Sequence, residues 1–352
     1  MKLSFKIGKN WKRRETIFFL ERMELYLSSG LEINKSLEIC EQGVSAKQKD
    51  AIFRLRSAVE SGSLLSKSLY QYAGVSQTLT GLIEQGELSG SLPKSLLSAR
   101  LLLEKEDELI KKCTSAMAYP VIIGIFAGLL TIGLVRGVMP QIIPMLKSLK
   151  VELPIITKVV IALSDILTKY GLYIITGLFI IGVAGILIYR KIRIIRKIIQ
   201  STIIHIPIIG RLVHDYYLAV FLHSCGALIE SGRPVAESYS NTSASISLLP
   251  LRDLLQREVV SVSSGHSLGS VIIGGKIPSY VASLLSAGEL SGSLGSSIIR
   301  AGSILDRDIE HSLKKLTALI EPIMMAGMGC AVGAIALSIM MPIYDISRVL
   351  QK

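Results

Sequence analysis

Hydrophobic positions along the chain follow two patterns. Three stretches contain no charged residue: Thr114 to Val135, Tyr170 to Tyr189 and Pro322 to Tyr344. Each reaches the roughly 20 apolar residues that a helix needs to cross a bilayer. Elsewhere apolar residues recur at helical spacing, as at Ile17, Leu20, Met23 and Leu27. The pattern therefore predicts three transmembrane helices and several amphipathic helices.

A sequence repeat divides the chain. The heptapeptide GELSGSL occupies residues 86–92 and again residues 288–294, an offset of 202 because 288 − 86 = 202. The same offset relates Ser29-Gly30 to Ser231-Gly232, Pro120 to Pro322, and Met139-Pro140 to Met341-Pro342. One register therefore relates two polar segments and the apolar spans that follow them, which indicates a duplicated unit.

Within each copy the apolar spacing and the Gly and Pro positions predict six helices joined by short turns. In the first copy these helices cover 13–28, 35–42, 45–60, 64–72, 76–87 and 91–112. In the second they cover 212–230, 234–242, 250–262, 266–273, 278–289 and 293–314. Strand-like alternation is absent, so the expected fold is an all-α membrane protein with two homologous cytosolic six-helix bundles and three transmembrane helices.

The expected domain order follows from these elements. A first cytosolic helical domain occupies 1–113 and a first transmembrane helix 114–137; an extracytoplasmic loop covers 138–169, and a second transmembrane helix 170–189. A second cytosolic helical domain covers 190–319, a third transmembrane helix 320–344, and an extracytoplasmic tail 345–352.

Orientation is read from lysine and arginine near the ends of the spans. A basic cluster follows the second span at once and consists of Arg190, Lys191, Arg193, Arg196 and Lys197. The 138–169 loop holds four widely spaced lysines. We therefore expect the N-terminus and the 190–319 domain to be cytosolic and the C-terminus extracytoplasmic, with the basic cluster against anionic lipid.

Composition argues against several kinds of ligand and site. The net charge is +12, but no basic stripe with interleaved aromatic residues or zinc-finger spacing is present, which argues against nucleic acid. The four cysteines are scattered and form no C-x-x-C pair, so neither a disulfide framework nor a zinc site is expected. No cofactor motif is found.

The repeated heptapeptide is typical of a helix–turn–helix junction. Gly90 and Gly292 suit the positive φ that ends a helix. Glu87 and Glu289 fall in the last turn of the preceding helix, where the helix dipole disfavours an anion. Each carboxylate therefore needs a partner, and three remain open: a structural tie between helices, a partner protein, or a divalent metal ion.

Enzymatic chemistry finds no support. Residues 269–277 resemble a P-loop, but Ser270 and Ile277 stand where the motif needs Gly and Ser or Thr. His205, His214 and His223 are spaced nine apart, so successive ones lie on opposite faces of a helix. The spans carry no ionisable residue, which argues against a membrane transporter or channel component; that alternative stays open, because broken helices can form a site without charge.

The duplicated G-E-x-S-G-x-L junction, the Ser-Gly helix ends and the P-x-x-G-R-L entry at 207–212 together resemble the type II secretion system F / PilC family. The resemblance covers residues 13–345 and makes Gly86, Glu87, Gly90, Gly288, Glu289 and Gly292 the signature or partner-contact positions. It implies a non-enzymatic platform protein of the inner membrane.

In that role the chain would couple a cytosolic hexameric assembly ATPase to extraction of pilin or pseudopilin from the membrane. Its other implied partners are a retraction ATPase, further inner-membrane pilus subunits and copies of itself in a homo-oligomer. The short segment before the first bundle suggests a type IV pilus, of the type IVb class, or a competence pseudopilus.

Overall fold

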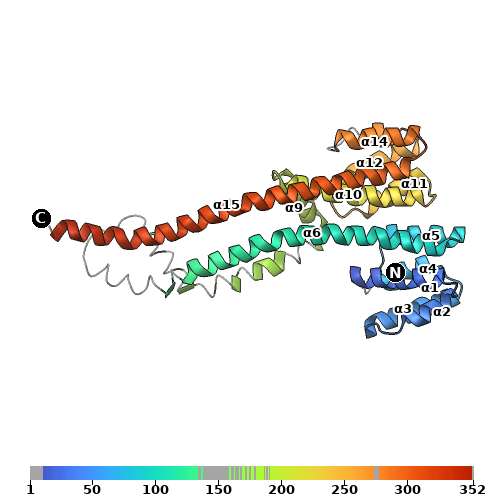
Figure 1. Cartoon of the computed structure of the whole chain (residues 1–352), viewed down its shortest axis with the longest axis horizontal. Helices are drawn as coiled ribbons and strands as arrows, with labels where there is room; N and C mark the ends of the chain where they lie inside the picture. Colours follow the sequence, from blue (N-terminus) through green and yellow to red (C-terminus); the bar gives the residue numbers. More distant parts are fainter. Residues whose placement is uncertain are drawn as a thin grey trace. The chain divides into compact units, whose positions relative to one another are not determined.

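The computed structural model describes residues 11–133, 136–137, individual positions between 158 and 189, 191–272 and 277–350 (Figure 1). Every regular element in this described part is a helix. The all-α fold with a duplicated helical domain is therefore confirmed.

The first copy is built around α1 (Arg13–Ser28), α2 (Ile33–Cys40), α3 (Ala46–Glu60) and α4 (Leu65–Ser68), which continues into a π-helical turn, η1 (Leu69–Ala73). Then follow α5 (Gln77–Ser89) and α6 (Leu92–Gly133). Leucines from successive helices fill a shared core, among them the fully buried Leu20, Leu37, Leu55 and Leu82. Burial of these side chains contributes about 2 kcal/mol each toward folding.

The second copy repeats this order after a connecting helix, α9 (Arg193–His205). It contains α10 (Ile209–Glu230), α11 (Val235–Ser245), α12 (Leu249–Ser263), α13 (Leu268–Ile272), α14 (Ser279–Leu290) and α15 (Leu294–Leu350). Phe221 and Tyr239 meet edge to face in its core, with ring centroids 5.1 Å apart.

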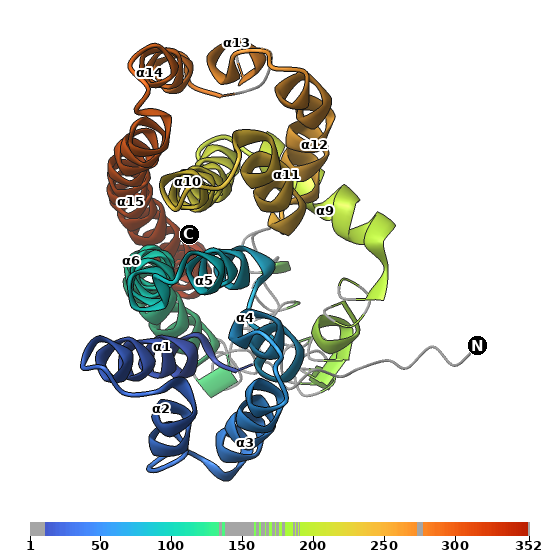
Figure 2. The same ribbon diagram turned by 90° about the vertical axis from the view of Figure 1, so that its right-hand side faces the viewer.

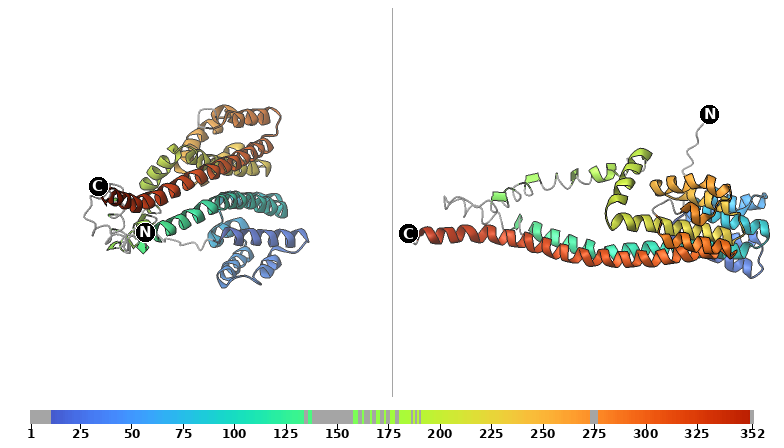
Figure 3. Two further views of the ribbon diagram at one scale, coloured as in Figure 1. Left: turned by 60° about the vertical axis from the view of Figure 1, so that its left-hand side comes forward. Right: turned by 90° about the horizontal axis from the view of Figure 1, so that it is seen from above.

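The predicted helices are confirmed to within a few residues, with two differences. The predicted 64–72 helix is a short α-helix followed by a π-turn. The last bundle helix of each copy runs without a break into the apolar span, so that α6 has 42 residues and α15 has 57 (Figure 3). No glycine or proline lies between 112 and 119, or between 312 and 321, to end either helix there.

The chain divides into two compact units: residues 1–112 with 200–311, and residues 113–199 with 312–352. The first unit holds both helical copies. In the second unit, large apolar side chains such as Ile125, Phe126, Leu129 and Ile323 are exposed. A water-soluble protein seldom exposes so many together, whereas lipid-facing helices do.

Three described helices are long and apolar enough to cross a membrane: α6, α10 and α15. Their apolar windows differ in surroundings, because those of α6 and α15 are 6% buried and that of α10 is 61% buried. The α10 helix also buries polar groups, including His214 and Asp215. We therefore assign α10 to the core of the second bundle.

The predicted second span, 170–189, is described at 12 of its 20 positions. Its described positions, including the run 180–185, are helical.

Candidate functional site

Glu87 ties α5 to the start of α4. Its Oε1 accepts a hydrogen bond from the Leu65 backbone N–H at 2.5 Å. Its Oε2 accepts from the Ser66 N–H at 3.0 Å and from the Ser66 hydroxyl at 2.6 Å. The first N–H groups of a helix lack partners within the helix, and they carry the positive end of its dipole. The carboxylate of Glu87 supplies those partners from 21–22 residues away along the chain.

Glu289 repeats this arrangement in the second copy. Its Oε1 accepts from the Leu268 N–H at 2.7 Å, at the first residue of α13. Its Oε2 accepts from the Ser267 hydroxyl. The serine sits one position earlier than the equivalent of Ser66, yet the carboxylate still binds one hydroxyl and a helix-start N–H. Of the three partners considered for these acids, the structure shows the tie between helices.

Gly86 and Gly288 allow two helices to approach closely. A Cβ on Gly86 would lie 2.1 Å from Ser95 Oγ of α6, and a Cβ on Gly288 would lie 2.5 Å from Ser297 Cβ of α15. Real Cβ atoms do not come so near another heavy atom, so only glycine fits while the helices stay in place. Ser95 and Ser297 are again 202 residues apart, since 297 − 95 = 202.

Gly90 and Gly292 turn the chain between those helices. Their φ angles are +70° and +67°, in the left-handed region that glycine adopts without steric cost. The Ser91 N–H donates to the Gly86 carbonyl at 2.9 Å, and the Ser293 N–H to the Gly288 carbonyl at the same distance. The predicted positive φ is confirmed in both copies.

Each junction also carries an exposed leucine. Leu88 is 70% exposed and its equivalent Leu290 is 91% exposed. The same position of the repeated heptapeptide is therefore exposed to solvent in both copies.

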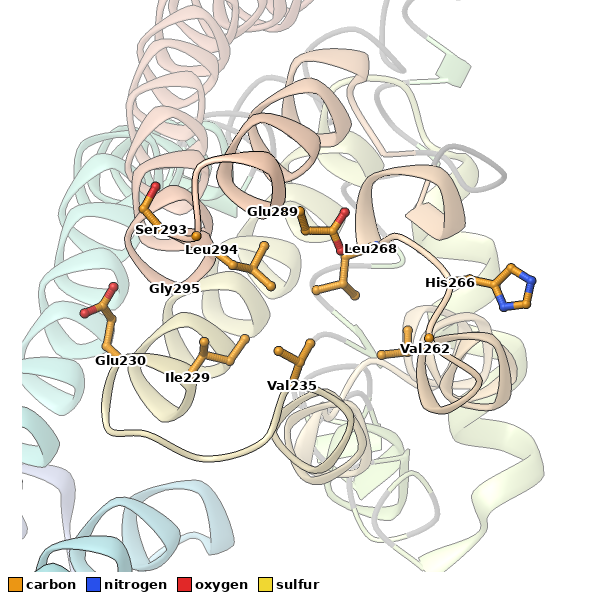
Figure 4. A pocket seen from close by; sticks show the side chains of 12 residues that line it. Ile229, Glu230, Val235, Val262, His266, Leu268, Glu289, Ser293, Leu294 and Gly295 are labelled. Carbon is orange, nitrogen blue, oxygen red and sulfur yellow. Dashed lines mark hydrogen bonds between the residues drawn. The ribbon is translucent and has the colours of Figure 1, made fainter.

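A pocket of about 570 Å³ lies beside the second junction (Figure 4). The side chains of Ile229, Val235, Leu268 and Leu294 project into it, whereas the His266 ring points away. Glu289 lies at its rim and is already engaged with α13. The lining therefore mixes these apolar side chains with polar residues, which are Glu230, His266, Glu289 and Ser293.

Arg233 joins the two copies. Its Nη2 lies 2.7 Å from Glu84 Oε2 of the first copy, and its Nη1 lies 2.8 Å from Glu237 Oε1 of the second. The arginine side chain is 9% exposed. Two carboxylates therefore bind a nearly buried guanidinium at the seam between the bundles.

Asp306 forms a second polar link between the copies. This buried carboxylate accepts from His223 Nε2 at 3.0 Å and from Lys105 Nζ at 3.3 Å. Burial by itself would raise the pKa of Asp306, but the hydrogen bond and charge of His223, helped by Lys105, hold it below its usual value. Nearby, burial raises the pKa of Glu106, against the opposing charge of Arg13.

The predicted basic cluster falls on the start of α9. Lys191 and Lys197 are exposed, Arg196 is partly buried, Arg190 lies outside the described residues, and only the backbone of Arg193 is described. The isoleucines Ile194 and Ile198 are exposed beside them. At the far end, Gln200 fixes the chain to the second copy, since its Oε1 accepts from the Leu249 N–H at 2.8 Å.

No group of three His, Cys, Asp or Glu residues able to hold a metal occurs in the described part of the chain. The sequence did not reveal the Arg233–Glu84 and His223–Asp306 pairs. Their members are 149 and 83 residues apart, and nothing in their local pattern distinguishes them from surface charges.

These features define a class: a multi-pass helical membrane protein with a duplicated helical domain. A family model described as "Type II secretion system (T2SS), protein F" matches residues 19–140 and 221–342. The two matches start 202 residues apart, since 221 − 19 = 202, as the heptapeptide repeat does. The chain belongs to this family.

Curated relatives agree. The chain is 28% identical to a type IV pilus assembly protein PilC of Thermus thermophilus, over 95% of this chain and 82% of the relative. It is 25% identical to a PilC of Pseudomonas aeruginosa, over 97% and 92%. It is 26% identical to a type II secretion system protein F of Aeromonas hydrophila, over 95% and 87%. The family and the apolar helices together make this chain a multi-pass inner-membrane protein.

Proposed function

We propose that this chain is the membrane platform of a type IV pilus or type II secretion machine. It couples a cytosolic hexameric assembly ATPase to extraction of pilin or pseudopilin from the membrane and to fibre assembly. The observation that carries the proposal is the paired family match, which falls on both copies in one register. The relatives named above take part in pilus assembly or type II secretion, which supports the same role here.

The arrangement of the helical copies suits a mechanical part. Each copy has one long helix that leaves the bundle and continues as an apolar segment, α6 and α15. At the bundle end of each, a glycine at close approach and a carboxylate tie hold the preceding helix. Force applied to a bundle by an ATPase would therefore pass along a continuous hydrogen-bonded helix.

Deletion of the gene tests the proposal. We expect surface fibres, seen by electron microscopy, to disappear and to return with the wild-type gene, while pilin remains expressed. Complementation with Glu87→Ala plus Glu289→Ala asks whether the two junctions are needed. Normal fibres in the deletion strain would refute the platform role and turn attention to membrane transport, for which flux in liposomes is the direct assay.

The ATPase step needs its own test. We expect the full-length protein in detergent to retain a purified assembly ATPase from the same cell, and expect no nucleotide hydrolysis by the chain alone. Retention that is unchanged when the exposed Leu88 and Leu290 are both replaced by Asp would place the ATPase contact elsewhere on the bundles.

A further inference from the structure

The duplication allows the seam between the copies to be compared with the surfaces that each copy leaves free. At the seam, the turn between α10 and α11 of the second copy packs on α5 of the first (Figure 2). Leu228, in the last turn of α10, is buried within the first copy's core. A Cβ on Gly81 of α5 would lie 3.4 Å from Arg233 Nη1 and 3.6 Å from Leu228 Cδ2.

This seam is not reciprocal. The counterpart of α5 is α14, and the counterpart of the α10–α11 turn is the α1–α2 turn at Ser29–Leu31. Yet α14 packs on α13 and makes no comparable contact with α1 or α2 among the described elements. In Figure 2, α14 and the α1–α2 pair lie at opposite ends of this unit. Each chain therefore leaves two surfaces unused, the α1–α2 turn and the face of α14 that corresponds to the covered face of α5.

The unused turn exposes two leucines beside the polar residues Ser28, Ser29 and Glu32. Leu25 is 61% exposed, and Leu31, the counterpart of Arg233, is exposed as well. In the second copy the equivalent of Leu25 is Ala227, which packs against the first copy's core. The first copy therefore presents to solvent two leucines at positions that are covered in the second.

The unused face of α14 is uncharged. Its exposed residues are Ser279, Ser283, Ala287 and Leu290. Ser283 is the counterpart of Gly81, and Ala287 is the counterpart of Gln85. In the first copy Gln85 faces the docked turn, because its Nε2 would lie 3.9 Å from a Cβ on Gly232. In α5 the helix is covered on both sides, and Thr78 and Thr80 are buried.

The two members of the seam's ion pair change together. Arg233 becomes Leu31 in the other copy, and Glu84 becomes Ser286. The α1–α2 turn docked on α5 would bury Glu84 without its cation, whereas an arginine docked on α14 would find no carboxylate at that position. The arginine of the turn and the carboxylate of the helix are thus both present at the observed seam and both absent from the unused turn and α14, so each turn suits a different helix.

We propose that chains of this protein associate head to tail, with the α1–α2 turn of one chain docked on α14 of the next. The occupant of the uncharged face is therefore a second copy of the chain. Contacts of this heterologous kind either close into a ring or continue as a filament. Chains that share one membrane orientation can extend such a contact only within the membrane plane.

Cross-linking between two different variants tests the direction of the contact. Full-length Leu31→Cys and Ala287→Cys carry different epitope tags and also the Cys113→Ala and Cys330→Ala changes. They are co-expressed and treated with a short bis-maleimide in native membranes. We expect a cross-linked dimer that holds both tags, and none when either variant is expressed alone. A product from one variant alone, or none from the mixture, would overturn the proposal.

A blocking substitution tests the face itself. Ser283→Arg places a long charged side chain where the docked turn would lie, while Ser283 is exposed in the single chain. We expect the detergent-purified full-length protein to lose its oligomer mass and the mixed cross-link, with its thermal unfolding unchanged.

The matched control is Ser57→Arg. Ser57 is also an exposed helical serine whose hydroxyl donates to the carbonyl four residues earlier, as that of Ser283 does. It lies on α3, away from both surfaces, and should leave the mass unchanged. An unchanged mass in Ser283→Arg, or cross-links from the Ala287→Cys variant only to another protein, would refute self-association through α14.

Discussion

At the scale of single residues, the two glycines of each junction are required for different reasons, close helix approach at Gly86 and a positive φ at Gly90. Substitutions should distinguish these two reasons. Gly86→Ala forces a Cβ to within 2.1 Å of Ser95 Oγ, so the helices must move apart. We expect a loss of about 1–3 kcal/mol, as for other overpacked cores. Gly90→Ala meets no atom within 4 Å and loses only the left-handed conformation, about 1–2 kcal/mol. Chemical unfolding of the full chain in detergent measures both.

Only the first of these losses should be reversible by a second change. Ser95→Gly removes the side chain that the new Cβ would strike, so Gly86→Ala with Ser95→Gly should regain most of the stability. Ser95→Gly should do nothing for Gly90→Ala. Equal rescue of both alanine variants would mean that close approach at Gly86 is not what requires glycine.

The junction carboxylates distinguish a helix tie from a cation site. Glu87→Ala leaves the Leu65 and Ser66 N–H groups without their acceptor, so we expect a loss of about 1–3 kcal/mol in unfolding free energy. Glu289→Ala should behave alike through Leu268. The thermal midpoint of the wild type should not respond to EDTA. A fall with EDTA that vanishes in Glu87→Ala plus Glu289→Ala would instead identify a bound divalent ion.

Asp306 makes a pH-dependent contribution whose sign follows from its lowered pKa. The ionised carboxylate stabilises the fold at every pH above the unfolded-state value of about 4, and this stability is lost as the pH falls through the folded-state pKa. Asp306→Asn should therefore destabilise the protein at pH 5, and by less as the pH falls toward and below 4. The exposed Asp50→Asn, which breaks only a surface pair with Arg54, should show a much smaller difference.

At the scale of elements, helix positions follow from local pattern, and contacts between the copies do not. The α1 and α3 helices begin and end within a residue of their predicted limits, because apolar spacing and the Gly30 and Gly62 turns are local signals. The α6 helix continues through 112–114 because no residue there ends a helix. Dividing the sequence into a domain and a span placed a boundary at that point, where the helix has none.

The parts of the site were predictable to different degrees, because some depend on local sequence and others on contacts between distant segments. Glu87 was marked as an acid needing a partner, because its place in the last helical turn is a local fact. Its partner, the start of α4, lies across the bundle and could not be read from spacing. Likewise Arg233 and Glu84 meet only because α10 and α5 pack together, and no pattern along the chain records that packing.

The α10 helix offers a test at this scale, because its composition alone would permit a membrane span. If α10 lies in the core of the second bundle, its two flanks share one side of the membrane. Ile206→Cys and Ser245→Cys, both at exposed positions, should then react with an impermeant maleimide only after the inner membrane is opened. Labelling of one and not the other in intact spheroplasts would make α10 a span.

Native thiols should interfere little with this measurement. Burial raises the pKa of the Cys40 thiol to about 11, against the lowering effect of Arg22, and raises that of Cys225 to about 12. Maleimides react with the thiolate, which both cysteines then rarely form at neutral pH. Cys113 and Cys330 are replaced by Ala in the labelling background.

At the scale of the whole molecule, the duplication sets a requirement on topology. Two copies of one domain, each followed by a span, face the same side only if the chain returns across the membrane between them. The copies do pack in one unit, through Arg233–Glu84 and Lys105–Asp306, so they must share a side. The contacts between the two bundles and the apolar run at 170–189 therefore both lead us to expect a return span between 133 and 200.

The distribution of lysine and arginine then predicts on which side of the membrane the two bundles lie. Five basic residues follow 189 at once, whereas the 138–169 segment carries only scattered lysines, so the bundles should be cytosolic. Ser148→Cys and Ser347→Cys should be labelled by an impermeant maleimide in intact spheroplasts, and Ser89→Cys only after lysis. Replacing Arg190, Lys191 and Arg193 with Gln should weaken this preference and yield a mixed pattern, because those charges hold the return span's end inside. Labelling of Ser89→Cys before lysis would reverse the assignment, and the bundles could then no longer meet a cytosolic ATPase.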